Sequence, residues 1–168
     1  MSLRKHLPAL LTAFLLVMAG CTKEPPPQPA STVVPSDHVA PSPVGTSQNI
    51  LQKTFPLGSS AIFPFEIPAH AVEPHLHGIF ESFLGQVHGT SDDTANIDFL
   101  LLNEEQQADF VSNSPSEALF TVEGSHNQAV NFDLPASRNQ PVKYYLVFRN
   151  TDGKKGSKIV EANFRVDF

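Results

Sequence analysis

The last nine residues of the chain alternate strictly between apolar and polar side chains. A period of two matches a β-strand, because successive side chains of a strand leave on opposite faces, and it does not match the 3.6-residue period of a helix. One face of this strand is therefore expected to be buried and the other wet, as in an antiparallel sheet that covers a core. The apolar face carries Val160, Ala162, Phe164, Val166 and Phe168, and the polar face carries Glu161, Asn163, Arg165 and Asp167.

The same period recurs from about Gln48 to the end of the chain, with turn residues at regular intervals. Seven or eight short strands in some 120 residues predict an all-β fold, a single antiparallel β-sandwich of jelly-roll-like type. Pro64 interrupts the alternating run from Ala61 to Ile67 and predicts an edge strand, since proline cannot donate to a ladder. The only helix we expect is a turn or two around Glu104–Phe110.

Three segments of this region resemble strands of the GOLD (Golgi dynamics) family. His77-Gly78-Ile79-Phe80 resembles the family's glycine-aromatic strand, and residues 96–103 its central strand with the turn that follows. Residues 144–150, followed after seven residues by Lys158-Ile159-Val160, are similar to its closing hairpin. The resemblance covers residues 75–168 and implies a β-sandwich that binds proteins or lipids and has no catalytic residues. The transmembrane helix and coiled coil of the family's cargo receptors have no counterpart here.

The beginning of the chain resembles the signal peptide of a bacterial lipoprotein. Basic Arg4 and Lys5 precede an apolar stretch from Leu7 to Val17, which is too short to span a bilayer comfortably. The run Leu15-Leu16-Val17-Met18-Ala19-Gly20-Cys21 is similar to the lipobox of that family, with Met18 where Leu is commonest. The resemblance implies cleavage before Cys21 and attachment of lipid to its thiol. An ordinary secretory signal and a permanent membrane span are the alternatives.

A proline-rich segment separates Cys21 from the predicted sandwich. Residues 24–45 contain almost no large apolar side chains, so they cannot bury enough surface to offset their ordering entropy. We interpret residues 21–47 as a disordered tether between the signal peptide (residues 1–20) and the β-sandwich domain (residues 48–168). Proline-rich chains reach about 3.1 Å per residue, so this tether can hold the domain several nanometres from a bilayer. A proline-motif ligand for a partner is the alternative.

The net charge and the cysteine count exclude several functions. Without residues 1–20 the chain has nine basic and 17 acidic residues, a formal charge of −8, which argues against nucleic acid as a partner. Cys21 is the only cysteine, so with its thiol lipidated no disulfide, thiolate metal site or thiol catalysis is possible. The lipoprotein resemblance also implies a location. Thr22 follows Cys21 where Asp would signal retention in the inner membrane, so we expect the outer membrane, facing the periplasm.

Two histidines offer the main alternative to a purely protein-binding role. His75 and His77 are two residues apart, so in a strand both side chains leave the same face. Neutral imidazoles suit Zn²⁺ or Cu²⁺, although a site needs a third ligand from elsewhere. Solvated histidines on the outer face of a sheet are the plainer interpretation.

A cluster of acidic and amide side chains offers oxygen ligands that could suit Ca²⁺, although such clusters more often build turns. The cluster consists of Asp92, Asp93, Asn96 and Asp98. No nucleophile elbow or phosphate-binding glycine loop is visible in the sequence, so we expect no enzyme and no cofactor.

The strand around Tyr144–Arg149 suggests where a partner could bind. If Tyr144, Leu146 and Phe148 face the core, Tyr145 and Arg149 share the opposite face with Val147. Tyrosine and arginine dominate many binding surfaces, so Tyr145 and Arg149 are the predicted binding surface. The alternative is that a loop or the tether covers Tyr145. Together these features predict a membrane-anchored, non-enzymatic lipoprotein whose sandwich binds another envelope component, in first place a protein. A periplasmic metal-binding lipoprotein that uses His75 and His77 is the second hypothesis.

Overall fold

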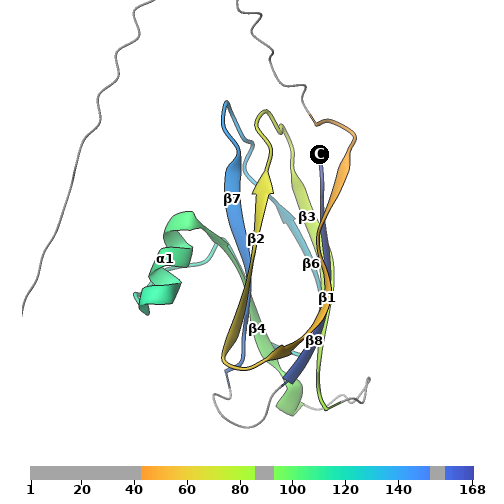
Figure 1. The fold of residues 1–168 in the computed structure, drawn as a ribbon, viewed down its shortest axis with the longest axis vertical. Coiled ribbons are helices and arrows are strands. Elements are labelled where there is room, and N and C mark those ends of the chain that lie inside the picture. The colour runs from red at the N-terminus through yellow and green to blue at the C-terminus, as the bar shows by residue number, and fades with distance from the viewer. Residues whose placement is uncertain (1–42, 86–92, 152–157) are drawn as a thin grey trace, which may run out of the picture. The chain divides into compact units, whose positions relative to one another are not determined.

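A computed structural model describes residues 43–85, 93–151 and 158–168 of the 168-residue chain (Figure 1). The predictions for the signal peptide, Cys21 and most of the tether therefore lie outside the described residues, and they stay predictions. The described part contains eight strands, a short 3-10 helix (η1, Asp93–Ala95) and one α-helix (α1, Glu104–Ser112). The strands are β1 (Ser47–Leu57), β2 (Ser60–Ile67), β3 (His75–Leu84), β4 (Ile97–Asn103), β5 (Phe120–Ser125), β6 (Asn127–Asp133), β7 (Val142–Arg149) and β8 (Lys158–Asp167).

The strands form two four-stranded antiparallel sheets that pack face to face. The first sheet has the order β1-β8-β3-β6 and the second the order β2-β7-β4-β5. This is the strand order of an eight-stranded jelly roll, in which sequential strands pass back and forth between the sheets. The predicted all-β sandwich is thereby confirmed. One strand, β1, covers residues for which the alternation alone suggested no separate element.

The alternation of the final strand corresponds to burial residue by residue. Val160, Ala162, Phe164 and Val166 are buried in β8, and the four residues between and after them are exposed or half-buried. Phe168 lies just beyond the strand and packs half-buried against the same core. Strand β8 is central in its sheet, flanked by β1 and β3, so its apolar face lies over the middle of the sandwich.

Phenylalanine rings fill the space between the sheets. Phe99 from β4 stacks on Phe164 from β8 with ring centroids 5.2 Å apart and planes within 9° of parallel. Phe148 meets both rings at steeper angles, and Phe80 stacks on Phe99 at 5.7 Å. All four side chains are fully buried, so these contacts join strands of both sheets into one core.

Two local predictions about the second sheet are confirmed. Strand β2, which contains Pro64, lies at the edge of its sheet and pairs only with β7 among the described strands. The expected helix is α1, and it begins with a capping box in which Asn103 accepts from the backbone of Gln106 and the Gln106 side chain accepts from Asn103 N. It ends at Asn113, whose left-handed backbone closes the last turn. Within the described residues no helix is long and apolar enough to cross a bilayer.

Helix α1 lies outside the sandwich, on the outer face of the second sheet (Figure 1). It connects the central strand β4 to the edge strand β5, so the chain leaves the sheet, forms the helix and returns. The outer face of the first sheet carries no helix among the described residues. The two outer faces of the sandwich therefore differ in whether a helix lies on them. The predicted residues His75 and His77 belong to the first sheet, and Tyr145 and Arg149 belong to the second.

Candidate functional site

Strand β7 sends alternate side chains to the core and to the outer face of the second sheet. The inward residues Tyr144, Leu146 and Phe148 belong to the main core, as predicted, and burial raises the pKa of the Tyr144 hydroxyl. The predicted exposure of Tyr145 on the other face is wrong. Tyr145 is only 9% exposed, and Val147 is fully buried.

The reason for this burial is a second, smaller apolar cluster under α1. Leu102 from β4 joins Tyr145 and Val147 there, and Phe110 of α1 and Ala118 pack against them. The alternative interpretation, that a loop or the tether covers Tyr145, is therefore right in that Tyr145 is covered, but the cover is not the tether. The covering segment includes the helix that follows β4.

Arg149 remains partly exposed, but it has a partner that the sequence did not reveal. Its Nε and Nη2 atoms donate to Oδ2 of Asp98 at 3.1 and 2.7 Å, and Asp98 Oδ1 accepts from Gly124 N at 3.0 Å. The Asp98 side chain is 5% exposed and that of Arg149 is 44% exposed. The two residues lie directly opposite each other on paired strands β4 and β7. The pair fixes the guanidinium at the outer face.

Asp98 was expected as a member of an acidic turn cluster. Its two carboxylate oxygens are taken by Arg149 and Gly124, and Asn96 Oδ1 instead meets His126 Nδ1 at 3.0 Å. Asp92 lies outside the described residues. Among the described residues no group of three or more His, Cys, Asp or Glu side chains could hold a metal ion. The geometry of Asp98 therefore favours a structural role over a Ca²⁺ ligand.

A groove runs beside α1 on this outer face, and we call it the α1 groove. Its volume is about 780 Å³. Its apolar lining comes from strands β2 and β4 and from the last turn of the helix: Ile62, Leu100, Leu102, Phe110 and Val111. Its polar lining includes Ser60, Gln106, Asn113, Arg149 and Asn150. Sequence reasoning found Arg149 but not the groove, because the groove depends on where α1 packs.

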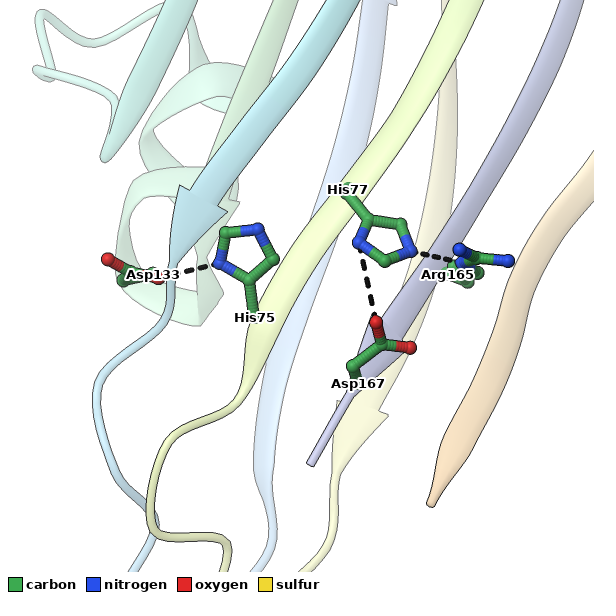
Figure 2. A network of polar contacts seen from close by, with 5 residues as sticks. All are labelled: His75, His77, Asp133, Arg165 and Asp167. Atoms are coloured by element: carbon green, nitrogen blue, oxygen red, sulfur yellow. Dashed lines mark hydrogen bonds and ion pairs between the residues drawn. The ribbon is translucent and has the colours of Figure 1, made fainter. Parts of the chain in front are cut away.

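The outer face of the first sheet holds His75 and His77 in a network of polar contacts (Figure 2). Both rings leave the same face of β3, as predicted, with centroids 5.7 Å apart. His75 Nδ1 contacts Oδ1 of Asp133 on neighbouring β6 at 2.6 Å. His77 Nδ1 lies 3.5 Å from Oδ2 of Asp167 on β8, and Arg165 Nε donates to His77 Nε2. A hydrogen bond from Ser47 lowers the pKa of Asp167, and the nearby Arg165 acts in the same direction.

These contacts determine what His77 can bind. An arginine N–H can only donate, so His77 Nε2 is an acceptor and its lone pair points at the guanidinium. A metal ion would need that lone pair and would also meet the positive charge of Arg165. The described arrangement therefore favours a polar surface network over a metal site. It was not visible in the sequence, because Asp133 and Arg165 are brought to the histidines only by strand pairing.

Comparisons with known proteins add a likeness of fold. No family model and no curated protein matches the sequence. Solved structures that match include the 1.0 Å crystal structure of the pre-peptidase C-terminal domain of a collagenase from Bacillus anthracis. The identity is 12%, the match covers 72% of this chain and 89% of that chain, and the TM-score is 0.41. The resemblance to the GOLD and lipoprotein families stays a prediction.

Proposed function

We propose that this chain is a membrane-anchored, non-enzymatic envelope lipoprotein whose β-sandwich binds another envelope component, a protein in first place. The observation that carries the binding role is the α1 groove. It is of the size of ligand-binding clefts, about 300–1,000 Å³, and combines an apolar floor with a few polar groups. Val111 in its wall is 61% exposed, so its side chain is open to contact with a partner that enters the groove.

The anchoring part of the proposal rests on the lipobox-like run ending at Cys21 and on the tether. Two or three acyl chains hold a protein to a bilayer far more firmly than one, at about 0.8 kcal/mol for each buried methylene. A tether of 27 residues gives the domain a reach of several nanometres toward a partner, which a purely structural anchor would not need. We place the protein in the outer membrane, facing the periplasm.

Photo-crosslinking in intact cells tests the binding role. A benzophenone amino acid replaces Val111 in the α1 groove or, as a control, Ile79, which is 48% exposed on the outer face of the other sheet. We expect one discrete envelope protein to be crosslinked from position 111 and not from position 79. Equal crosslinking from both positions, or none from position 111, would contradict the assignment of the groove.

Fractionation tests the anchor separately. Cys21→Ser removes the thiol that would carry the lipid, so we expect the variant to leave the membrane fraction after a carbonate wash while the unaltered chain stays. A variant that remains with the membranes would show that something other than the lipid holds it there.

The metal-binding alternative is tested by equilibrium dialysis against Zn²⁺ and Cu²⁺. Because Arg165 occupies His77 Nε2, we expect no micromolar binding that distinguishes the unaltered chain from a His75→Ala/His77→Ala variant. Micromolar binding that the double substitution abolishes would instead support a periplasmic metal-binding lipoprotein.

A further inference from the structure

We infer that the outer face of the first sheet is the contact surface for a second copy of this chain. The two copies are related by a two-fold axis that runs across the strands at Ile79 and Asn163, which are register partners in the β3–β8 pairing. The α1 groove lies on the other sheet, so this dimer goes beyond the proposed function and does not depend on it.

Two glutamates face each other across the central strands of this sheet. Glu81 of β3 and Glu161 of β8 are register partners, and both alternate with buried residues, so both side chains leave the outer face. Like charges directly opposite each other destabilise a sheet. Within residues 43–85, 93–151 and 158–168, neither carboxylate takes part in an ion pair. The described part of the chain therefore brings no counter-charge to these two adjacent acids.

Arg165 supplies a positive charge farther along the same face. It follows Glu161 by four residues on β8, so the two side chains point the same way, about 13 Å apart along the strand. Its Nε atom donates to the uncharged acceptor His77 Nε2 (Figure 2). Asp167 lies within electrostatic range, but no carboxylate of the described residues forms an ion pair with this guanidinium. Glu161 and Arg165 of one copy are too far apart to pair with each other.

A two-fold axis across the strands brings these opposite charges together. On β8 it passes through Asn163, halfway between Glu161 and Arg165, and it lays β8 of one copy antiparallel over β8 of the other. Glu161 of each copy then lies over Arg165 of the other, and this contact occurs twice because the interface is isologous. On β3 the same axis passes through Ile79 and brings Glu81 to the same end of the other copy. An axis along the strands would instead stack glutamate on glutamate, so the charges select the antiparallel arrangement.

The row of side chains on the axis suits the centre of an interface. Its members are register partners across all four strands and none of them is charged: Gln52, Asn163, Ile79 and Ala129. Ile79 is 48% exposed, so covering it removes apolar surface from water. A centre without charges and a polar, charged margin is the usual anatomy of a protein interface.

The face is large enough for a dimer. Four strands about 4.8 Å apart and up to ten residues long span roughly 19 by 33 Å. That is about 600 Å² for each copy and about 1,200 Å² in total, which lies at the lower end of the range for specific interfaces. Among the described residues no helix lies on this face (Figure 1), so a second copy has direct access to it. We therefore expect a reversible dimer.

The remaining charges of the face lie at its end, beyond the paired rows (Figure 2). They already have partners in the same copy, because His75 contacts Asp133 at 2.6 Å and Asp167 is bonded by Ser47 and lies 3.5 Å from His77. Aligned sheets cross at about 30°, so the ends of the two faces diverge. This end therefore needs no contact with the second copy.

Photo-crosslinking in intact cells tests the dimer. Two copies of the full chain with different tags are produced together, and a benzophenone amino acid replaces Ile79 in one of them. We expect a product that carries both tags, which distinguishes it from the adduct with another envelope protein expected at position 111. The same amino acid in place of Val111 should give no product with both tags.

Charge exchange in both copies tests how they are arranged. Glu161→Arg and Arg165→Glu each replace two ion pairs by like-charge contacts, so each should lower the yield of the two-tag product by about fivefold or more. The combined variant re-forms both pairs with the charges exchanged and should restore most of the yield. Glu66→Arg, the same change on the outer face of the second sheet, should leave the yield unchanged. Glu161→Arg also removes the repulsion by Glu81, so its melting midpoint should not fall, which separates loss of the dimer from loss of the fold.

Each contrary result overturns the dimer. The absence of a two-tag product from position 79, or capture of a different protein there, would show that a second copy does not cover this face. A combined variant that stays as low as the single ones would show that Glu161 and Arg165 do not meet. The binding role of the α1 groove is tested separately at position 111, so it stands or fails on that result alone.

Discussion

Substituting Gly78 tests how closely the two central strands of the first sheet approach each other. Gly78 lies opposite Phe164 in the β3–β8 pairing, and its missing side chain leaves room for the Phe164 ring. A Cβ atom at this position would come within 2.5 and 2.6 Å of Cδ1 and Cγ of that ring, and nearer still to the carbonyl oxygen of Asn163. Real Cβ atoms essentially never come that close to such atoms, so Gly78→Ala requires a shift of the ring or the backbone.

Neither shift is cheap. Phe164 is fully buried and lies 5.2 Å from Phe99 in a nearly parallel stack, so its ring cannot move away without disturbing the core. Asn163 O belongs to backbone in the middle of a paired strand. Overpacking of this kind costs about 1–3 kcal/mol and sometimes more, and we expect about 2–3 kcal/mol for Gly78→Ala. For a domain of this size that corresponds to a Tm lower by roughly 6–12 °C.

Urea melts of the full chain, followed by near-ultraviolet circular dichroism, provide the measurement. Gly58→Ala is the matched control, because nothing lies within 4 Å of a Cβ built there. It should change the free energy of unfolding by no more than about 0.5 kcal/mol. Adding Phe164→Leu to Gly78→Ala should cost less than the sum of the two single changes, since the shorter side chain relieves part of the clash. A loss below about 0.5 kcal/mol for Gly78→Ala alone would refute the close approach of β3 and β8.

Four further substitutions test three other parts of the fold by the same melts. Val166→Asp buries a carboxylate in the core and should lower the free energy of unfolding by at least about 3 kcal/mol. Arg165→Asp, on the exposed face of the same strand, should lower it by about 0.5 kcal/mol or less. Equal losses would contradict the assignment of the buried and exposed faces of β8. Arg149→Ala leaves the buried carboxylate of Asp98 without its cation, so we expect a loss of about 2 kcal/mol, and no loss would mean that the pair is only superficial. Asn103→Ala removes the capping box of α1 and should cost about 1 kcal/mol, and an unchanged midpoint would argue against the cap.

The period-two pattern of the sequence determined the class of fold and the faces of its clearest strands. The faces of β8 and of β7, the edge position of the strand with Pro64, and the existence of α1 were all predictable. These features depend on neighbouring residues, on steric alternation and on the donor that proline lacks, so they can be read locally. The proline-rich composition of residues 24–45 also predicts a tether before the domain, because ordering requires large apolar side chains that this segment largely lacks, and this stays a prediction.

Only the tertiary structure decided what each outer face could do. The burial of Tyr145 depends on α1 folding back over the second sheet, and the pairing of Arg149 with Asp98 joins residues 51 positions apart. The contact of Arg165 with His77 spans 88 positions in the same way. Strand register brings such groups together, and register depends on the summed packing of two whole sheets rather than on any short run of sequence. For the same physical reason, the sequence did not predict the α1 groove, because the groove depends on how the helix packs on the second sheet.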